Sequence, residues 1–250
     1  MRRRVDTWPV GRNRKKTPRV PAGTRIYAVG DIHGCVGLLD PLLARIDADL
    51  AANPVEHPIQ VFLGDYLDRG PASREVLDRL IELVETHNAV CLKGNHEAFA
   101  LEFLENPGNF DDWRRWGGLE TLISYGLVPS GIVGQEKRKE LANALKQAMP
   151  RSHQEFLAKL PLTYDCGDFF FVHAGVRPGV RLAAQQEHDL IWIRDEFLSS
   201  EADFGKVIVH GHTPVQAPDF QRNRINIDTG AYVTGRLTCL VIEDESLFLI

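Results

Sequence analysis

The 250-residue sequence predicts an α/β domain in which helices flank two packed β-sheets. Three observations predict this fold. Apolar runs of strand length alternate with stretches of helical apolar spacing through residue 92. Each run of strand length is followed by glycine and polar residues. Short β-rich runs joined by turns follow near the C-terminus, and they predict antiparallel pairing and a second sheet packed on the first.

The first half of the chain has the order strand, loop, helix, strand, loop, helix, strand. Apolar strands are expected at residues 24–29, 59–63 and 89–92, and helical spacing covers residues 38–50 and 72–85. This order favours parallel strands joined by right-handed crossovers. The polar residues that follow the strands should therefore lie at the carboxyl edge of one sheet, where open α/β sheets bind ligands.

Residues 98–160 change in character, because they are helix-prone, aromatic and partly polar. We expect them to form a helical insertion over one side of the sheet. Trp113 and Trp116 are three residues apart and can share one helix face, where core packing is favoured and substrate contact is the alternative. Further strands are expected at residues 169–172, 207–209, 224–227, 237–242 and 247–250.

Composition and charge indicate a globular domain with a basic arm. Hydrophobic content of 44% and charged content of 25% are ordinary for a soluble protein. Residues 1–25 hold nine Lys or Arg against one Asp, whereas the remainder holds 20 basic and 33 acidic residues. We expect a disordered arm at residues 1–22 and a single domain at residues 23–250. The acidic domain argues against specific nucleic-acid binding, although the arm leaves contact with nucleic acid, anionic lipid or an acidic partner as an alternative.

Neither a secretion signal nor a membrane span is expected. No apolar run of signal-peptide length follows the basic residues 2–4, and no stretch approaches the roughly 20 apolar residues of a membrane span. The cysteines have no C-x-x-C spacing, which favours reduced thiols in a cytoplasmic protein. They are Cys35, Cys91, Cys166 and Cys239.

Five motifs at the ends of predicted strands contain potential metal ligands beside glycine. They are Gly30-Asp31-Ile32-His33-Gly34, Gly64-Asp65-Tyr66-Leu67-Asp68-Arg69-Gly70, Gly94-Asn95-His96-Glu97, His173-Ala174-Gly175 and His210-Gly211-His212-Thr213. Mixed carboxylate, imidazole and amide ligands suit Mn, Fe or Zn better than Ca. The motifs supply more ligands than one tetrahedral site needs, so two metal ions are expected, with Asp65 as the central choice for a bridging carboxylate.

In this order the motifs resemble the PPP family of metallophosphatases, which comprises the Ser/Thr protein phosphatases and their bacterial relatives. The resemblance covers roughly residues 24–235. It implies a metallophosphoesterase-type β-sandwich of two mixed sheets flanked by helices. It also implies a phosphatase that uses two divalent metal ions, Mn foremost and Fe or Zn as alternatives, and a metal-activated hydroxide for direct in-line attack on phosphorus.

The resemblance further implies the metal ligands. One ion would be held by Asp31, His33 and the bridging Asp65. The other would be held by Asp65 together with Asn95, His173 and His212. His210 competes for this last position, but Gly211-His212-Thr213 fits the family pattern and leaves His210 a supporting or structural role.

Residues that act on the phosphoryl group follow from the same resemblance. His96 would be the general acid, oriented by Asp68, and Arg69 would bind the phosphoryl oxygens. A second phosphate-binding arginine is expected at Arg194, in the context Trp192-Ile193-Arg194, with Arg177 as the alternative. Gly64 and Gly70 would allow a tight backbone, and Tyr66 and Leu67 would pack beneath the site.

The substrate depends on the rim of the site rather than on the fold. Residues 117–126 resemble a segment common in bacterial Ser/Thr phosphatase-like members and favour a phosphoprotein or phosphopeptide substrate. A symmetrical bis(5'-nucleosyl)-tetraphosphatase is the alternative, for which residues 114–115 and 137–139 would supply a basic rim. A non-catalytic phosphopeptide-binding module is a remote alternative, because such a module should lack a ligand, the general acid or a phosphate arginine, and all are present.

Overall fold

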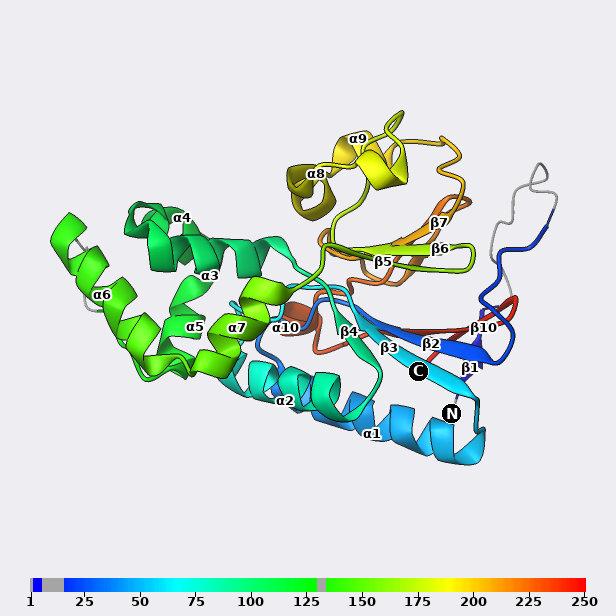
Figure 1. The fold of residues 1–250 in the computed structure, drawn as a ribbon, viewed down its shortest axis with the longest axis horizontal. Helices are drawn as coiled ribbons and strands as arrows, with labels where there is room; N and C mark the ends of the chain where they lie inside the picture. Colours follow the sequence, from blue (N-terminus) through cyan, green and yellow to red (C-terminus); the bar gives the residue numbers. More distant parts are fainter. Residues whose placement is uncertain (1, 6–15, 130–133) are drawn as a thin grey trace.

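Two mixed β-sheets lie at the centre of the computed structural model, which describes residues 2–5, 16–129 and 134–250 (Figure 1). The first sheet has the strand order β1-β11-β10-β2-β3-β4. Strands β2, β3 and β4 are parallel, as predicted, whereas the pairs β10–β2, β10–β11 and β1–β11 are antiparallel. The strands are β1 (Arg3–Arg4), β2 (Thr24–Val29), β3 (His57–Phe62), β4 (Ala89–Cys91), β10 (Cys239–Glu243) and β11 (Ser246–Leu249).

The second sheet has the order β5-β6-β7-β9-β8. Its central strands β6, β7 and β9 are parallel, and the edge strands β5 and β8 run antiparallel to their neighbours. Two of these strands, β5 and β8, were not predicted. The strands are β5 (Thr163–Cys166), β6 (Phe169–Val172), β7 (Val207–His210), β8 (Asp219–Phe220) and β9 (Arg224–Asn226).

The predicted antiparallel pairing of the later strands is only partly correct. It holds for β10 and β11, which form a tight hairpin but extend the first sheet. It is wrong for β9, which belongs to the second sheet and runs parallel to β7, as β6 does. Residues 173–206 and 211–223 connect these three strands, and connections of a dozen or more residues allow the chain to cross over and return in the same direction.

Side chains that alternate along the strands divide the core into layers. Ile26 and Val61 of the first sheet meet Phe171 and Val209 of the second sheet between the two. On the outer face of the first sheet, Phe62 and its neighbours pack against α1 (Val36–Ala52) and α2 (Ser73–Thr86). The outer face of the second sheet is covered by α8 (Glu187–Trp192) and α9 (Asp195–Leu198). The predicted sandwich flanked by helices is therefore confirmed.

The helical insertion predicted for residues 98–160 lies beside the sandwich, at the left of Figure 1. No helix within residues 2–5, 16–129 and 134–250 has both the length and the apolar character of a membrane span. The insertion contains α3 (Asn95–Glu105), the 3-10 turn η1 (Pro107–Asn109), α4 (Phe110–Arg115), α5 (Gly118–Ser124), α6 (Gln135–Ala148) and α7 (Arg151–Lys159). Elsewhere the chain forms the 3-10 turn η2 (Leu182–Ala184) and α10 (Ala231–Thr234).

The two tryptophans of the insertion have different environments. Trp113 is fully buried, and its ring lies 4.9 Å from that of Phe103. Trp116 is 41% exposed. Core packing is therefore correct for Trp113 and wrong for Trp116, because α4 ends at Arg115 and Trp116 leaves the helical spacing.

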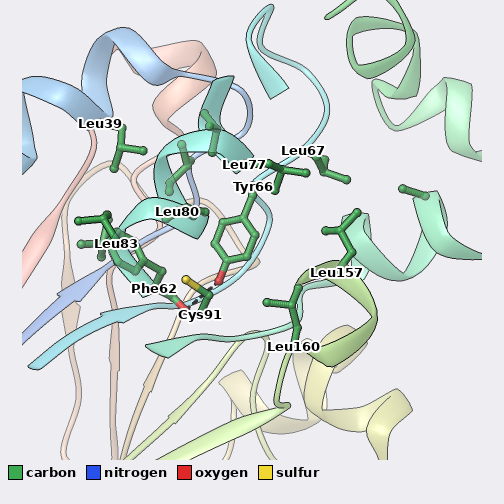
Figure 2. Close-up of a cluster of buried hydrophobic side chains, with 14 of the residues drawn as sticks. Leu39, Phe62, Tyr66, Leu67, Leu77, Leu80, Leu83, Cys91, Leu157 and Leu160 are labelled. Atoms are coloured by element: carbon green, nitrogen blue, oxygen red, sulfur yellow. Dashed lines mark hydrogen bonds between the residues drawn. The ribbon is translucent and has the colours of Figure 1, made fainter. Parts of the chain in front are cut away.

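Two side chains of the loop after β3 anchor this loop to the core, as predicted. Figure 2 shows Tyr66 and Leu67 among apolar side chains of α2 and of the end of α7, including Leu157. Both residues are fully buried. The Tyr66 hydroxyl also donates a hydrogen bond to the carbonyl oxygen of Leu92 at 2.7 Å, which joins this loop to the end of β4.

The N-terminal arm is ordered where the structure describes it, in contrast to the expected disordered tail. Arg3 and Arg4 form β1, which adds hydrogen bonds to the edge of the first sheet. The Arg2 guanidinium lies 2.6 Å from the carboxylates of both Asp49 and Glu243. Backbone pairing and these ion pairs offset the entropy lost on ordering. Residue 1 and residues 6–15 of the predicted arm lie outside the described residues.

Candidate active site

The loops that follow the parallel strands have an unusual backbone. His33, Asp65, Asp68, Arg69 and His212 all have positive φ, between 46° and 69°. This left-handed region is unfavourable for residues with a Cβ atom, and such residues cluster at functional sites. Every one of these five residues was a predicted site residue, so the strain is concentrated at the predicted site.

Close approach of these loops requires glycine. Gly64 has φ of 106°, and a Cβ atom there would lie 2.8 Å from the Gly94 nitrogen. A Cβ atom on Gly70 would lie 2.1 Å from the carbonyl oxygen of His33. The predicted tight backbone at Gly64 and Gly70 is therefore confirmed.

One group of donor atoms is formed by Asp65, Asn95, His173 and His212. Asn95 Oδ1 lies 3.0 Å from His173 Nε2 and 2.8 Å from His212 Nδ1, and the two imidazole nitrogens are 3.2 Å apart. Asp65 Oδ1 lies 3.3 Å from His173 Nε2. All four side chains are buried. Four convergent oxygen and nitrogen donors fit a divalent transition metal.

A second group lies on the other side of the Asp65 carboxylate. Asp65 Oδ2 is 3.5 Å from His33 Nε2 and 3.7 Å from His96 Nε2. Asp31 lies next to His212, because its Oδ2 accepts the His212 backbone N–H at 3.0 Å. The other Asp31 oxygen is buried without a hydrogen-bond partner among the described residues. A buried, unpaired carboxylate oxygen beside these donors fits a cation.

Hydrogen bonds from the far side of two rings orient the donor nitrogens. His33 Nδ1 donates to the carbonyl oxygen of Leu67, and His173 Nδ1 donates to that of Leu63, both at 2.9 Å. These bonds leave the Nε2 lone pairs directed at Asp65. Fixing the tautomer of a ligand imidazole through its other nitrogen is usual in metal sites.

Burial sets the protonation states that metal ligation needs. It lowers the pKa of His33 to about 3 and that of His212 to about 2, and it lowers the pKa of His173 as well. Burial alone would raise the pKa of Asp65, but the surrounding imidazoles, His173 foremost, outweigh it and lower that pKa. Neutral imidazoles around an ionised carboxylate are the ligand forms that bind a metal ion.

His96 differs from the other imidazoles because it faces two carboxylates. Its Nδ1 lies 2.7 Å from Asp68 Oδ2. Burial acts to lower the pKa of His96, but the charge of Asp65 and the hydrogen bond with Asp68 outweigh it, so the pKa is raised. Its Nε2 lies 3.2 Å from an Arg69 guanidinium nitrogen. A buried imidazole whose pKa is raised by neighbouring carboxylates, against the opposing charge of Arg69, is suited to general-acid catalysis.

The Arg69 side chain contacts His96 and Tyr232. Its guanidinium carbon lies 4.7 Å from the ring centre of Tyr232, a cation–π distance. The Tyr232 ring also packs edge-on against His33, at 5.3 Å. Tyr232 is 40% exposed and was not predicted. These contacts hold the guanidinium beside His96 and Tyr232.

Of the two candidates for a second phosphate arginine, Arg194 has the better position. Burial chiefly lowers the pKa of His212, and the charge of the exposed Arg194 side chain adds to that lowering. Arg194 is therefore within electrostatic reach of the donor atoms. The Arg177 guanidinium is instead paired with Asp189, at 2.6 and 2.7 Å, and with Glu196 at 2.6 Å.

His210 belongs to neither donor group among the described residues. Its ring is fully buried edge-on against Phe197, 5.0 Å between centroids, and its Nδ1 donates to the carbonyl oxygen of Gly211. Burial lowers its pKa to about 3. This placement agrees with the structural role expected for it.

One buried carboxylate of the site was missed in the sequence. Asp228 follows β9 and accepts the Gly230 backbone N–H at 2.9 Å. Burial raises the pKa of Asp228 to about 6. Burial also raises the pKa of Asp31, and the charge of Asp228 is the next cause. The signal was present, since Asp228-Thr229-Gly230 repeats the pattern of a strand followed by an acid and a glycine.

Comparison with known proteins identifies relatives of the whole domain. Residues 24–239 match the calcineurin-like phosphoesterase family. The chain is 27% identical over 230 residues to the asymmetrical bis(5'-nucleosyl)-tetraphosphatase PrpE of Anoxybacillus flavithermus. It is 29% identical over 231 residues to the protein of the same name in Bacillus thuringiensis. Each alignment covers 85% of this chain and 88% of the relative.

Solved structures with the same fold include phosphatases of several kinds. A candidate diadenosine tetraphosphatase superposes with a TM-score of 0.63 at 21% identity and covers 94% of both chains. A cold-active protein tyrosine phosphatase of a psychrophilic Shewanella has a TM-score of 0.57 at 17% identity and covers 92% of this chain and 80% of its own. At these identities the likeness shows the fold. The family match spans nearly the whole described domain, and this chain belongs to the calcineurin-like phosphoesterase family.

Proposed function

We propose that this metal-dependent phosphoesterase removes phosphate from serine and threonine side chains of proteins. The observation that carries the metal-dependent chemistry is the position of Asp65. Its Oδ1 lies 3.3 Å from His173 Nε2, and its Oδ2 lies 3.5 Å from His33 Nε2. A carboxylate whose two oxygens face separate donor groups supports a metal ion on each side, the arrangement that suits displacement at phosphorus.

The donor set suits Mn, with Fe or Zn as alternatives. When bound, the two ions would activate a water molecule and neutralise charge on the phosphoryl group. One ion would be held by Asp31, His33 and Asp65, and the other by Asp65, Asn95, His173 and His212. The protein's own side chains must then hold the phosphoryl oxygens and supply the proton.

His96 would supply that proton to the leaving oxygen. Its Nδ1 is held by Asp68, so its Nε2 is the nitrogen that faces the site. The raised pKa of His96 favours the protonated form that a general acid needs. Arg69 and Arg194 would bind the phosphoryl oxygens, since a guanidinium matches two of them at once.

The His96–Asp68 pair favours an ester of an alcohol over an anhydride. A serine or threonine alkoxide is strongly basic and leaves only when it is protonated, so a positioned acid contributes most to that reaction. A nucleoside phosphate is a far weaker base and leaves without a proton. The pair therefore supports phosphoserine and phosphothreonine as substrates.

Cleavage of dinucleoside tetraphosphates is the second candidate. The observation that favours it is the name of the PrpE relatives, asymmetrical bis(5'-nucleosyl)-tetraphosphatase, at 27% and 29% identity. The sequence had instead suggested the symmetrical reaction as the alternative. The two reactions differ in their products, because asymmetrical cleavage of diadenosine tetraphosphate gives ATP and AMP and symmetrical cleavage gives two ADP.

A parallel assay of both substrate classes tests the proposal. The full-length chain with Mn is given phosphoserine, phosphothreonine and phosphotyrosine peptides and diadenosine tetraphosphate, and the products are separated by chromatography. We expect the highest kcat/KM on the first two peptides, with activity lost on chelation and restored by Mn. A preference for the dinucleotide would contradict the proposal, and its products would identify the cleavage. Absence of metal-dependent hydrolysis of every substrate would instead indicate a binding module.

A further inference from the structure

The carboxylate that orients His96 is held by the helical insertion. Asp68 Oδ2 accepts the indole N–H of Trp113 at 2.9 Å, in addition to its bond with His96. Asp68 Oδ1 accepts the hydroxyl of Thr121 at 2.5 Å. Asp68, Trp113 and Thr121 are all fully buried. Trp113 lies in α4 and Thr121 in α5, so both donors come from the insertion.

Thr121 holds the Asp68 backbone as well as its side chain. The Asp68 N–H donates to Thr121 Oγ1 at 2.9 Å, while the same hydroxyl donates to the Asp68 carboxylate. Asp68 has φ of 69°, an unfavourable conformation that needs support from its surroundings. The two bonds lock the side chain to its own backbone through one hydroxyl.

A pair of glycines brings the insertion close enough for these contacts. The Gly117 carbonyl oxygen accepts the Arg69 backbone N–H at 3.1 Å. A Cβ atom on Gly117, where φ is 97°, would lie 2.7 Å from Arg69, and one on Gly118 would lie 2.5 Å from the Trp113 ring. Residues 113–121 therefore pack directly against the Asp68-Arg69 segment.

We propose that Trp113 and Thr121 are positioning residues that aim His96 for proton delivery. This inference rests on the proposed general-acid role of His96. A buried carboxylate is stable only when its oxygens are hydrogen-bonded. With Trp113 and Thr121 in place, the Asp68 carboxylate has one orientation, and the His96 ring bonded to it has one as well. The insertion thus forms part of the catalytic machinery in addition to covering the core.

A purely structural role for these residues makes a different prediction. The Trp113 N–H needs some acceptor because it is buried, and a core residue would slow all substrates equally when replaced. A positioning residue for the general acid matters most when the leaving group is a strong base, because only then does the reaction depend on the proton. The dependence on leaving group therefore distinguishes the two roles.

The test uses three variants of the full-length chain. Thr121→Val keeps the shape and removes the hydroxyl, Thr121→Ser keeps the hydroxyl, and Trp113→Phe keeps a buried ring without the N–H. Turnover is measured on p-nitrophenyl phosphate, phenyl phosphate and a phosphoserine peptide, together with metal content and melting temperature. We expect Thr121→Val and Trp113→Phe to lose roughly tenfold or more on the peptide and about threefold or less on p-nitrophenyl phosphate, a part of the total effect of a general acid. Thr121→Ser should restore the peptide activity.

A measurement without substrate keeps the inference separate from the proposed function. The Nδ1 proton of His96, held by Asp68, should give a downfield NMR signal that is absent from His96→Gln. We expect this signal to shift or broaden in Thr121→Val and Trp113→Phe and to remain in Thr121→Ser. An unchanged signal in both of the first two variants, or equal losses on all three substrates, would overturn the inference. A native chain that hydrolyses no phosphate ester would refute the proposed function, and the NMR comparison would still decide whether the insertion orients His96.

Discussion

The carboxylate of Glu97 accepts the backbone N–H of Asp65 at 2.9 Å. It also accepts the N–H groups of Tyr66, at 2.8 Å, and Gly94, at 2.9 Å, so one buried side chain joins the loops that follow β3 and β4. Asp65 has φ of 52°, a conformation that costs on the order of 1–3 kcal/mol. The bonds to Glu97 offset this cost and hold the proposed bridging carboxylate in place.

Replacing Glu97 with Gln should weaken the contact between the loops that follow β3 and β4. The amide nitrogen cannot accept a hydrogen bond, so at least one buried N–H would lose its acceptor, at a cost of about 1–3 kcal/mol. We expect a lower free energy of unfolding in urea and weaker Mn binding by calorimetry. Glu102→Gln, at an exposed position on the same helix, is the matched control. If the two variants had the same free energy of unfolding and the same Mn affinity, Glu97 would not support the loops.

His96→Asn should remove turnover while leaving the metal ions bound. The variant retains a polar side chain but cannot deliver a proton, so we expect a loss of about 10²–10⁴-fold on a phosphoserine peptide. Metal content is measured by mass spectrometry on the same preparation. His96 Nε2 also lies 3.7 Å from Asp65 Oδ2. A variant that loses a metal ion would therefore reassign His96 as a ligand.

Asp65→Asn should abolish binding of both metal ions. The amide has no negative charge to share between two cations, and its nitrogen cannot act as a ligand in place of the second oxygen. We expect metal content near zero after dialysis against Mn. Asp47→Asn, on the exposed face of α1, controls for the loss of one carboxylate. Two ions retained in Asp65→Asn would contradict the bridging position.

The two candidate arginines should respond differently to removal. Arg194→Ala should weaken inhibition by inorganic phosphate by about 10- to 150-fold, because one charge-assisted contact to the anion is worth roughly 1.5–3 kcal/mol. Arg177→Ala should leave phosphate inhibition unchanged, since Asp189 and Glu196 already occupy its guanidinium. If Arg177→Ala weakened phosphate inhibition and Arg194→Ala did not, Arg177 would be the phosphate-binding arginine.

Arg2→Ala should destabilise the fold in a pH-dependent manner. Burial acts to raise the pKa of Asp49, but hydrogen bonds from Arg2 and Tyr27 outweigh it and lower that pKa. A depressed carboxyl pKa adds stability above the unfolded value, about 3.9, and this stability is lost as pH falls through the folded value. We expect Arg2→Ala to lower the free energy of unfolding by about 1–3 kcal/mol at pH 7, and the difference should shrink below pH 4.

Arg4→Ala is the control for this experiment, because Arg4 shares β1 but has an exposed side chain. It should change the free energy of unfolding by less than about 0.5 kcal/mol. If Arg2→Ala lowered the free energy of unfolding equally at pH 7 and pH 3, the ion pairs would be excluded as the cause.

Most donor residues of the site could be predicted from local sequence patterns and the order of the elements. Parallel strands bring their carboxyl ends to one edge, so Asp31, Asp65 and Asn95 could be placed together from the order of strands and helices. The glycine at position 64 is also explained by the loops, because they approach too closely there for a Cβ atom. Local pattern and neighbouring strands were sufficient for these residues.

Other contacts could not be predicted, because they depend on how distant segments pack together. The bonds of Asp68 to Trp113 and Thr121 span 45 and 53 residues, and their formation depends on how the insertion packs against the loop after β3. The direction of β6, β7 and β9 and the pairing of Arg2 with Glu243 likewise depend on which distant segment is adjacent. Sequence periodicity reports which face of an element is apolar, whereas hydrogen bonds between buried polar side chains depend on the exact docking of elements far apart in the chain.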